Sequence, residues 1–449
     1  MSDSNSFANH TRRDFIGYTA FAALGAGARV ISAEPQNQDA ATASGPEVPT
    51  HFFADQSFDF TFQIALGTAY YRGANPGKIL RIASQIKAGD SEGAYQALRK
   101  AGYEAQQIAV DCARRGHRVS AREAYLWAGN YIFASTYFLD GTNEPSRFLP
   151  TWKDYYACWE QAAALSDPPI ERVSIPYEGT TLTGWFFRVD EKKKRRPLLI
   201  LNNGSDGSEA DMWVMGAAGG LARGYNCLTF DGPGQGAALW LQKLYFRPDW
   251  EKVMTPVVDF ALKHQEVNPK QIALCGISQG GYWVPRALAF EHRIAAGIAD
   301  PGVWDVSAPY TRRLPPVVVD MLHSGKKEQF DSIVKAGISA SPQGRALLAF
   351  RMRPFGMSSY YDVFKAVLSY SMEGLADRIQ CPMLVTNPES EAFFPGQPKR
   401  LFDALKCKKA LVDFTVEDGA SLHCEVNSPG YRDLRIFDWL DETLSHPGR

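Results

Sequence analysis

Ile272-Ala-Leu-Cys-Gly-Ile-Ser-Gln-Gly-Gly281 carries the strongest structural signal in this chain. Its first four residues are apolar and predict a buried strand, and a helical pattern follows from Tyr282 to Phe290. The five residues after the strand have the pattern G-x-S-x-G, which is typical of a nucleophile elbow between a strand and a helix. Such a turn forces Ser278 into strained backbone angles, and a Cβ on either flanking glycine would collide with backbone. We therefore expect the Ser278 hydroxyl to stand clear of the sheet at a helix N-terminus; the alternative is a glycine-rich turn with a chance serine.

The bulk composition is that of a globular protein with material for two or three cores. The chain has 449 residues, of which 45% are hydrophobic and 22% charged, and its net charge is −1. This near-zero net charge gives no indication of a basic surface for nucleic acid, and the sequence has no apolar run long enough to span a membrane. The seven cysteines show no C-x-x-C spacing, and Cys227, Cys275 and Cys381 fall in or beside apolar strand patterns. Neither a disulfide framework nor a zinc framework is expected.

The first residues have the pattern of an export signal. Thr11-Arg-Arg-Asp-Phe-Ile16 is a twin-arginine motif, an apolar stretch runs from Phe15 to Ile31, and Ile31-Ser-Ala33 offers a cleavage site. We predict that residues 1–33 are a twin-arginine signal peptide and that residues 34–49 are a polar linker. The mature protein is then periplasmic or secreted. The alternative is a basic tail with a short amphipathic helix.

Residues 50–170 are predicted to form a helical N-terminal domain. Apolar residues recur at helical spacing in residues 78–87, 91–115 and 120–137. Ser120 and Glu123 have the spacing of a capping box at the start of the third helix. Trp127, Tyr131 and Tyr137 lie along that helix, where they either pack in a core or line a cleft.

The periodicity changes at residue 171. Residues 172–176 and 182–189 predict a hairpin, and the following apolar strands alternate with helices. The predicted strands are residues 197–201, 226–230, 272–275, 296–299, 382–386 and 410–414. The alternation predicts an α/β fold with a mainly parallel, doubly wound sheet. Its core is residues 171–309 and 376–449, and the helical residues 310–375 interrupt it as an inserted lid.

Two loops supply partners for Ser278. A serine needs a base within hydrogen-bond reach and an acid that orients the base. His423 lies between the last strand and the last helix, where this kind of fold supplies its base. The loop after the preceding strand holds Glu389 and Glu391, and we favour Glu391 as the acid with Glu389 as the alternative. The base would otherwise be an ordinary solvated loop histidine.

An oxyanion hole needs two N–H donors. The amide of Gln279 is one, and the loop Asn202-Asn-Gly-Ser-Asp-Gly-Ser208 should supply the other from Ser205 or Asp206. We predict Asp206 and Trp304 as substrate contacts. Asp231-Gly-Pro-Gly-Gln-Gly236 lacks the residues of a nucleotide-binding loop, and no His/carboxylate cluster suggests a metal, so no cofactor or metal is expected.

Five motifs together resemble one group of α/β-hydrolases. They are Asn203-Gly-Ser-Asp-Gly, Asp231-Gly-Pro-Gly-Gln-Gly, Gly276-Ile-Ser-Gln-Gly-Gly, Phe393-Phe-Pro-Gly-Gln and Gly419-Ala-Ser-Leu-His-Cys-Glu. The group includes 2,6-dihydroxypseudooxynicotine hydrolase and fungal polyketide-shortening (pigment) hydrolases, and the likeness covers most of residues 50–445. It implies an α/β-hydrolase fold and a Ser/acid/His triad without metal or cofactor. It also implies cleavage of a carbon–carbon bond next to a ketone. Carried over by motif, Ser278 is the nucleophile and His423 the base, and Glu391 stands where the group usually has aspartate.

The sequence therefore predicts an exported serine hydrolase with a Ser278–His423–Glu391 triad. Its partner is a small or medium carbonyl compound, either an ester or a ketone with a scissile C–C bond, and a homodimer is possible. For a C–C substrate, Asp300 and Asp305 are weak candidates to protonate the leaving carbanion. The alternatives are a prolyl-oligopeptidase-like aminopeptidase and a non-catalytic binding protein on the same fold.

Overall fold

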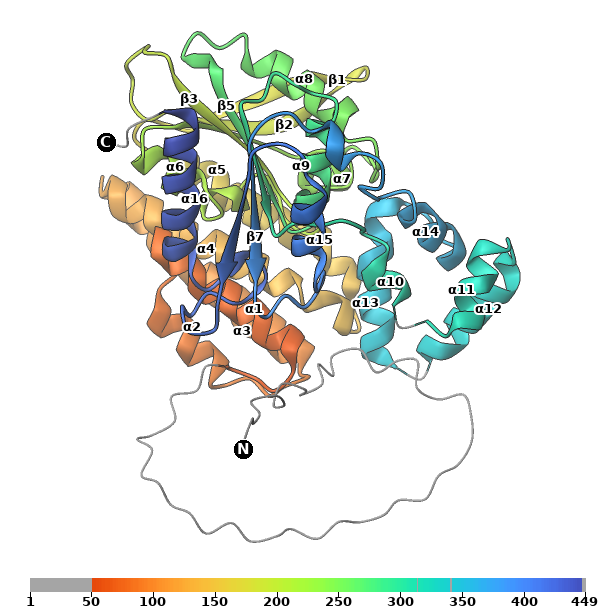
Figure 1. Ribbon diagram of the computed structural model, residues 1–449. Helices are drawn as coiled ribbons and strands as arrows, with labels where there is room; N and C mark the ends of the chain where they lie inside the picture. Colours follow the sequence, from red (N-terminus) through yellow and green to blue (C-terminus); the bar gives the residue numbers. More distant parts are fainter. Residues whose placement is uncertain (1–50, 313, 340, 446–449) are drawn as a thin grey trace, which may run out of the picture.

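An eight-stranded sheet runs through the molecule, with helices on both faces and two helical groups beside it (Figure 1). The computed structural model describes residues 51–312, 314–339 and 341–445. The predicted signal peptide and linker, residues 1–49, lie outside the described residues.

The sheet is mainly parallel, as the sequence predicted. Its order is β1-β2-β4-β3-β5-β6-β7-β8, with antiparallel pairs β1–β2 and β2–β4 and parallel pairing from β4 through β3 to β8. The elbow strand is longer than its apolar run because it begins at Val267. The strands are β1 (Glu171–Tyr177), β2 (Thr180–Phe187), β3 (Arg196–Asn202), β4 (Asn226–Phe230), β5 (Val267–Ile277), β6 (Ala296–Asp300), β7 (Met383–Pro388) and β8 (Lys409–Phe414).

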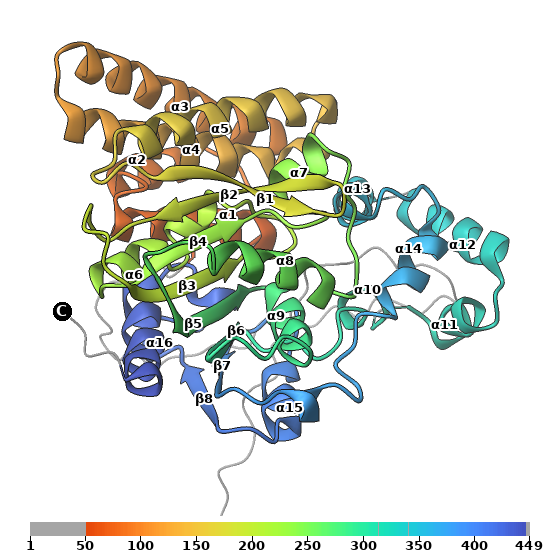
Figure 2. The same ribbon diagram turned by 90° about the horizontal axis from the view of Figure 1, so that it is seen from above.

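Helices bury both faces of the sheet, which is why its central strands are apolar without alternation. In β3, Leu198 and Ile200 join one hydrophobic cluster while Leu199 and Leu201 join the other. Figure 2 shows α8, α9 and α15 on one side and α6 and α16 on the other. The helices of the core are α6 (Ala217–Ala222), α7 (Gly236–Trp240), α8 (Glu251–Ala261), α9 (Gly280–Leu288), α15 (Gln397–Ala404) and α16 (Pro429–Leu444). Between β3 and β4 the sequence predicts a helix over residues 212–223, but the structure has only a 3-10 turn and the short α6, because Gly216 breaks the helix at φ 147°.

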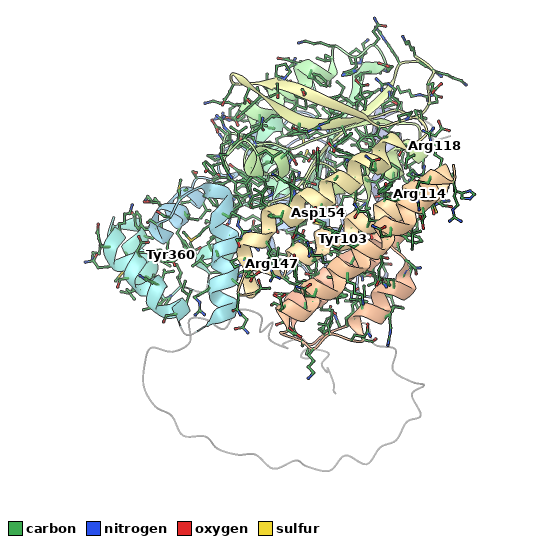
Figure 3. The ribbon with its side chains drawn as sticks, turned by 180° about the vertical axis from the view of Figure 1, so that it is seen from behind. Tyr103, Arg114, Arg118, Arg147, Asp154 and Tyr360 are labelled. Carbon is green, nitrogen blue, oxygen red and sulfur yellow. The ribbon has the colours of Figure 1, made fainter. Side chains whose placement is uncertain are left out.

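Five helices precede the sheet and share a core with it. Trp159 of α5 and Phe187 of β2 belong to one hydrophobic cluster, together with residues of α6 and α16. The helices are α1 (Gln56–Gly67), α2 (Pro76–Ala83), α3 (Ser91–Arg114), α4 (Arg118–Thr136) and α5 (Phe148–Ala164). Figure 3 shows Tyr103 of α3 beside Asp154 of α5, and the phenol donates to that carboxylate over 2.5 Å. The capping box predicted at Ser120 is wrong, because α4 begins two residues earlier and His117 is its N-cap.

A second helical group lies between β6 and β7 and projects from the sheet (Figure 1). It has a small core of its own, which includes Leu322, Phe330 and Phe364. Its helices are α10 (Ala308–Thr311), α11 (Pro316–His323), α12 (Lys327–Ser339), α13 (Pro342–Met352) and α14 (Tyr360–Val367). The 3-10 turns are η1 (Thr68–Tyr71), η2 (Leu139–Gly141), η3 (Pro145–Arg147), η4 (Asp211–Trp213), η5 (Arg353–Phe355), η6 (Ala376–Arg378) and η7 (His423–Glu425). In the described part of the chain, no helix combines the length and apolarity that crossing a membrane requires.

Candidate active site

The turn between β5 and α9 has the strained geometry that its glycines predict. Ser278 has φ 58°, a left-handed value that non-glycine residues rarely adopt. A Cβ on Gly276 would lie 2.2 Å from the carbonyl oxygen of Gly280, so only glycine fits there. The Ser278 N–H donates to the carbonyl of Asp300 over 2.7 Å, which ties the turn to the end of β6. The serine therefore stands at the carboxyl edge of the sheet, at the start of α9.

His423 meets Ser278 from the loop after β8. Its Nε2 lies 2.8 Å from Ser278 Oγ, and its Nδ1 lies 2.6 Å from Glu391 Oε2. An ionised carboxylate only accepts, so it fixes the proton on Nδ1 and leaves Nε2 to accept from the hydroxyl. The imidazole is 5% exposed, so little water competes for either bond.

Glu391 is held in place by two further hydrogen bonds. Its Oε1 accepts from the backbone N–H groups of Phe393 and Phe394 over 2.8 and 2.9 Å. Burial by itself raises the pKa of Glu391, but the charge and hydrogen bond of His423 and these two amides outweigh it and leave the pKa below its ordinary value. Glu389, the alternative acid, accepts from the Val416 N–H at an exposed position. The structure thus brings Glu391, and not Glu389, to His423.

Aromatic rings enclose the imidazole. The ring centres of Phe393, Phe394 and Phe60 lie 4.6, 6.2 and 6.2 Å from that of His423. Phe60 comes from α1, far away in the sequence, and no local pattern pointed to it. These rings exclude water from the His423–Glu391 bond.

The loop after β3 passes directly beside the serine. A Cβ on Gly204 would lie 2.7 Å from Ser278 Cβ and 3.3 Å from its Oγ, so the backbone comes this close only because residue 204 is glycine. Ser205 follows, and its hydroxyl donates to Asp206 over 2.6 Å. On the other side, Gln279 is the N-cap of α9, next to the first amides, which have no partner within the helix. Two backbone segments with N–H groups thus flank Ser278 Oγ.

The Asp231–Gly236 loop supports this segment. Gln235 Nε2 donates to the carbonyls of Asn203 and Gly204 over 2.8 and 2.9 Å. Asp231 Oδ1 accepts from Asn203 Nδ2 over 3.0 Å and from the Glu209 N–H over 2.8 Å. Sequence reasoning only excluded nucleotide binding for this loop and missed its structural role, because the role depends on contacts between distant segments.

A pocket lies next to Ser205 and Asp206. Its walls come from α4, the start of α5, α7 and the end of α13, and they include Tyr137, Phe148, Trp240, Phe350 and Arg353. Of the three aromatic residues that the sequence placed along α4, Tyr137 lines this pocket. Tyr131 is 2% exposed and accepts from the Asn75 N–H over 2.7 Å, and Trp127 packs in the helical cores.

The charge of Asp206 acts on two buried tyrosines. Burial raises the pKa of Tyr310 to about 12, with Arg351 opposing this rise and Asp206 adding to it. Burial also raises the pKa of Tyr137 well above its ordinary value, and Asp206 adds to that rise. Both phenols therefore stay protonated at neutral pH and can donate hydrogen bonds.

Three other sequence candidates do not line this pocket. Trp304 is 7% exposed in the core, its ring is covered by the Arg400 guanidinium at 4.6 Å, and it does not line the pocket beside Ser205. Asp305 Oδ1 accepts from the Ser307 N–H over 2.7 Å, a turn contact. Asp300 is fully buried and accepts from Thr386 Oγ1 over 2.8 Å. Among the described residues, no group of three His, Cys, Asp or Glu side chains is arranged to hold a metal ion.

Comparison with known proteins shows the family. No protein-family model matches the chain. Hydrolase LUC6 of a Fusarium species is 31% identical over 410 residues, covering 87% of this chain and 97% of the relative. Alpha/beta hydrolase psoB of Aspergillus fumigatus is 31% identical over 418 residues (87% and 94%). The 20-hydroxy-prefusarin hydrolase FUS2 of Gibberella moniliformis is 30% identical over 410 residues (88% and 98%).

Two solved structures share the fold. The 2,6-dihydroxy-pseudo-oxynicotine hydrolase superposes with a TM-score of 0.62 at 20% identity, covering 84% of this chain and 95% of that one. AbyA5 superposes with a TM-score of 0.58 at 14% identity, covering 87% and 94%. The sequence relatives and the sheet order agree: the chain belongs to the α/β-hydrolase family and is a hydrolase.

Proposed function

We propose that this chain is a serine hydrolase in which Ser278, His423 and Glu391 form the catalytic triad. The hydrogen-bonded series from Ser278 Oγ through His423 to Glu391 carries the proposal. His423 Nε2 takes the hydroxyl proton as Ser278 attacks a substrate carbonyl, and Glu391 stabilises the imidazolium that forms. The protonated His423 then gives its proton to the leaving group, and water hydrolyses the acyl-enzyme by the same steps in reverse order.

The oxyanion of the tetrahedral intermediate is bound by the amides of Gln279 and Ser205 in this proposal. Support comes from the approach of Gly204 to Ser278 Oγ and from the position of Gln279 at the start of α9. Backbone donors held in a buried loop need little reorganisation when the negative charge forms.

The proposed substrate is a small or medium compound with a carbonyl group and an aromatic or acyl part. Rings of Tyr137, Trp240 and Phe350 offer flat apolar walls, while Asp206 and the Tyr137 hydroxyl offer polar contacts. The scissile bond is an ester or a C–C bond next to a ketone. The resemblance to polyketide-shortening hydrolases favours the second, and then the carbanion takes its proton from His423, because Asp300 and Asp305 are engaged elsewhere.

The test is active-site labelling of the folded protein with a fluorophosphonate. We expect labelling of Ser278, none in Ser278→Ala, and strong weakening in His423→Ala. Ser324→Ala is the matched control and should label normally. The Ser324 hydroxyl lies at the end of α11 and donates to Asp320 O. Turnover of aryl esters, 1,3-diketones and aminoacyl-anilides then separates an esterase, a C–C hydrolase and an aminopeptidase. A folded wild type that neither labels nor turns over any of these substrates would contradict the proposal.

We also propose that the enzyme is exported by the twin-arginine route. The support is the motif at Arg12 and Arg13 with the apolar stretch and cleavage site that follow it. In a bacterial host, the full chain should appear in the periplasm in a shortened form. Replacing both arginines with lysine should leave it full-length in the cytoplasm, and unchanged export of that variant would refute the route.

A further inference from the structure

Cys381 and Cys407 each lie two residues before the first residue of the last two strands, β7 and β8. Met383 pairs with Lys409 in the parallel ladder of these strands, and the Met383 N–H donates to Lys408 O over 2.9 Å. The two cysteines lie in bends just before these paired residues, so the ladder holds the two segments close to each other.

The two thiols also pack against the same hydrophobic cluster. Met383 belongs to this cluster on the α9 and α15 face, and Lys409 Nζ reaches the carbonyls of Phe402 and Leu405 on that same face over 2.7 and 2.9 Å. Burial raises the pKa of Cys381 to about 12, and the neighbouring Cys407 thiol adds to this rise.

We propose that Cys381 and Cys407 are a reversible thiol–disulfide pair that joins β7 to β8 when the folded protein meets a disulfide oxidant such as oxidised glutathione. Adjacent strands are about 4.8 Å apart, which falls within the Cα separations of about 4.4 to 6.8 Å that a disulfide spans. Both thiols are free in the structure and half-buried. Their spacing in the sequence gave no reason to pair them; their positions just before two paired strands do.

The thiol–disulfide exchange needs only the two protein thiols and one molecule of the disulfide oxidant. The Cys407 thiolate attacks one sulfur of the oxidant and releases the other as a thiol, which leaves a mixed disulfide on Cys407. The Cys381 thiolate then attacks Cys407 Sγ and releases the second thiol. Two protein thiols lose two electrons and two protons, and the oxidant disulfide is reduced to two thiols.

The position suggests why such a bond matters. β8 is the edge strand and pairs only with β7 among the described strands. The opposite ends of these two strands lead into the loops with Glu391 and His423, so the bond would hold together the strands that carry the proposed acid and base. Exposed disulfides are the labile ones, and both cysteines are partly exposed, so the bond should be easily reduced.

The proposed export fits this chemistry but is not needed for the test. Disulfides persist outside the cytoplasm, and a chain exported in the folded state can form one only between thiols that already lie together. The pairing of β7 with β8 meets this condition, because it holds the segments with Cys381 and Cys407 together in the folded chain.

The experiment is oxidation of the folded protein by oxidised glutathione, followed by blocking of free thiols and peptide mapping by mass spectrometry. Wild type and the control Cys112→Ser should give one cross-linked peptide pair containing Cys381 and Cys407, which a mild dithiol reverses. Cys381→Ser should instead collect a glutathione adduct on Cys407. The oxidised wild type should melt a few degrees higher than the reduced protein.

The wild-type peptide map decides the matter even if a variant fails to fold. Free thiols at 381 and 407 after prolonged oxidation, separate glutathione adducts on both, or a cross-link to any other cysteine would each overturn the proposal. Fluorophosphonate labelling of the same samples reports on Ser278 independently, so the failure of either proposal can be recognised by itself.

Discussion

Two glutamates two residues apart have different environments, and this difference gives the first prediction. Glu391→Gln should lower kcat by about 10³ to 10⁴, because an amide neither stabilises the imidazolium nor fixes the proton on His423 Nδ1. Glu389→Gln is the matched control and should change kcat little, because Glu389 only accepts from the Val416 N–H at the surface. Steady-state kinetics of both variants, with circular dichroism to show that they fold, checks this; a larger loss in Glu389→Gln would reverse the assignment of the acid.

Beneath the proposed triad lies a pair of buried carboxyl groups. Asp300 and Glu425 are both 0% exposed, and a hydrogen bond joins their side chains. Two ionised carboxylates in contact and out of water repel each other, so one of them holds a proton. Burial, followed by the charge and hydrogen bond of Asp300, raises the pKa of Glu425 well above its ordinary value, while Arg432 opposes this. Glu425 is therefore the protonated partner at neutral pH, and it lies two residues after His423.

A raised carboxyl pKa makes stability fall as pH rises. Above its unfolded pKa of about 4.3, Glu425 binds a proton in the folded state and not in the unfolded state, at a cost of up to about 1.4 kcal/mol per pH unit. Glu425→Gln replaces the protonated acid with an amide that still donates to Asp300, so this variant should lose that contribution. Denaturant unfolding between pH 5 and 8 should show the wild type losing stability relative to Glu425→Gln; parallel curves would contradict a protonated Glu425.

At the scale of elements, local patterns predicted what local geometry decides. The elbow follows from its glycines, because a Cβ on Gly276 would strike the backbone of Gly280. The parallel strands follow from apolar runs that are buried on both faces. Three features could not be predicted from local patterns, because each depends on tertiary contacts or on competing caps. They are the start of α4, the break at Gly216 and the approach of Phe60 to His423.

The Asp231–Gly236 loop supports the segment with the proposed oxyanion donor Ser205, and this gives the third prediction. Gln235→Ala removes the two hydrogen bonds to the carbonyls of Asn203 and Gly204. The amides beside Ser278 should then be less well placed, and kcat should fall by about 10 to 10², less than for the loss of an oxyanion donor. Gln242→Ala, which loses exposed contacts to Thr180 and Thr181, is the control and should keep full activity. Equal kcat in both variants would show that the loop does not depend on Gln235.

For the whole molecule, the N-terminal helices are part of the site as well as of the core. Phe60 of α1 approaches His423, Tyr137 just after α4 lines the pocket, and Tyr71 donates to Asp433 of α16 over 2.5 Å. The change of periodicity at residue 171 marks where the sheet begins, but the hydrophobic cluster crosses that boundary. Removing these helices would expose one face of the sheet, so we do not expect the sheet to fold without them.

Arg353 joins three parts of the molecule at the wall of the pocket. It follows α13 in the inserted helices, donates to Asp140 in η2, and lies over the rings of Phe148 and Trp240 at 5.0 and 5.5 Å. Burial raises the pKa of Asp140, and Arg353 counteracts this rise, so loss of the arginine leaves a largely buried carboxylate without its cation.

Arg353→Gln should therefore loosen the inserted helices from the N-terminal helices. We expect KM to rise about 3- to 10-fold with a smaller change in kcat, because the pocket wall moves while the triad does not. Unfolding should become easier by about 1 to 3 kcal/mol. Lys327→Gln is the matched control, because its ion pair with Asp362 lies wholly within the inserted helices and is exposed, so KM should not change. Limited proteolysis gives a second readout: cleavage within residues 310–375 should accelerate in Arg353→Gln alone. If both variants behave like the wild type, the inserted helices are held by their apolar contacts, and the Arg353–Asp140 pair has no part in closing the pocket.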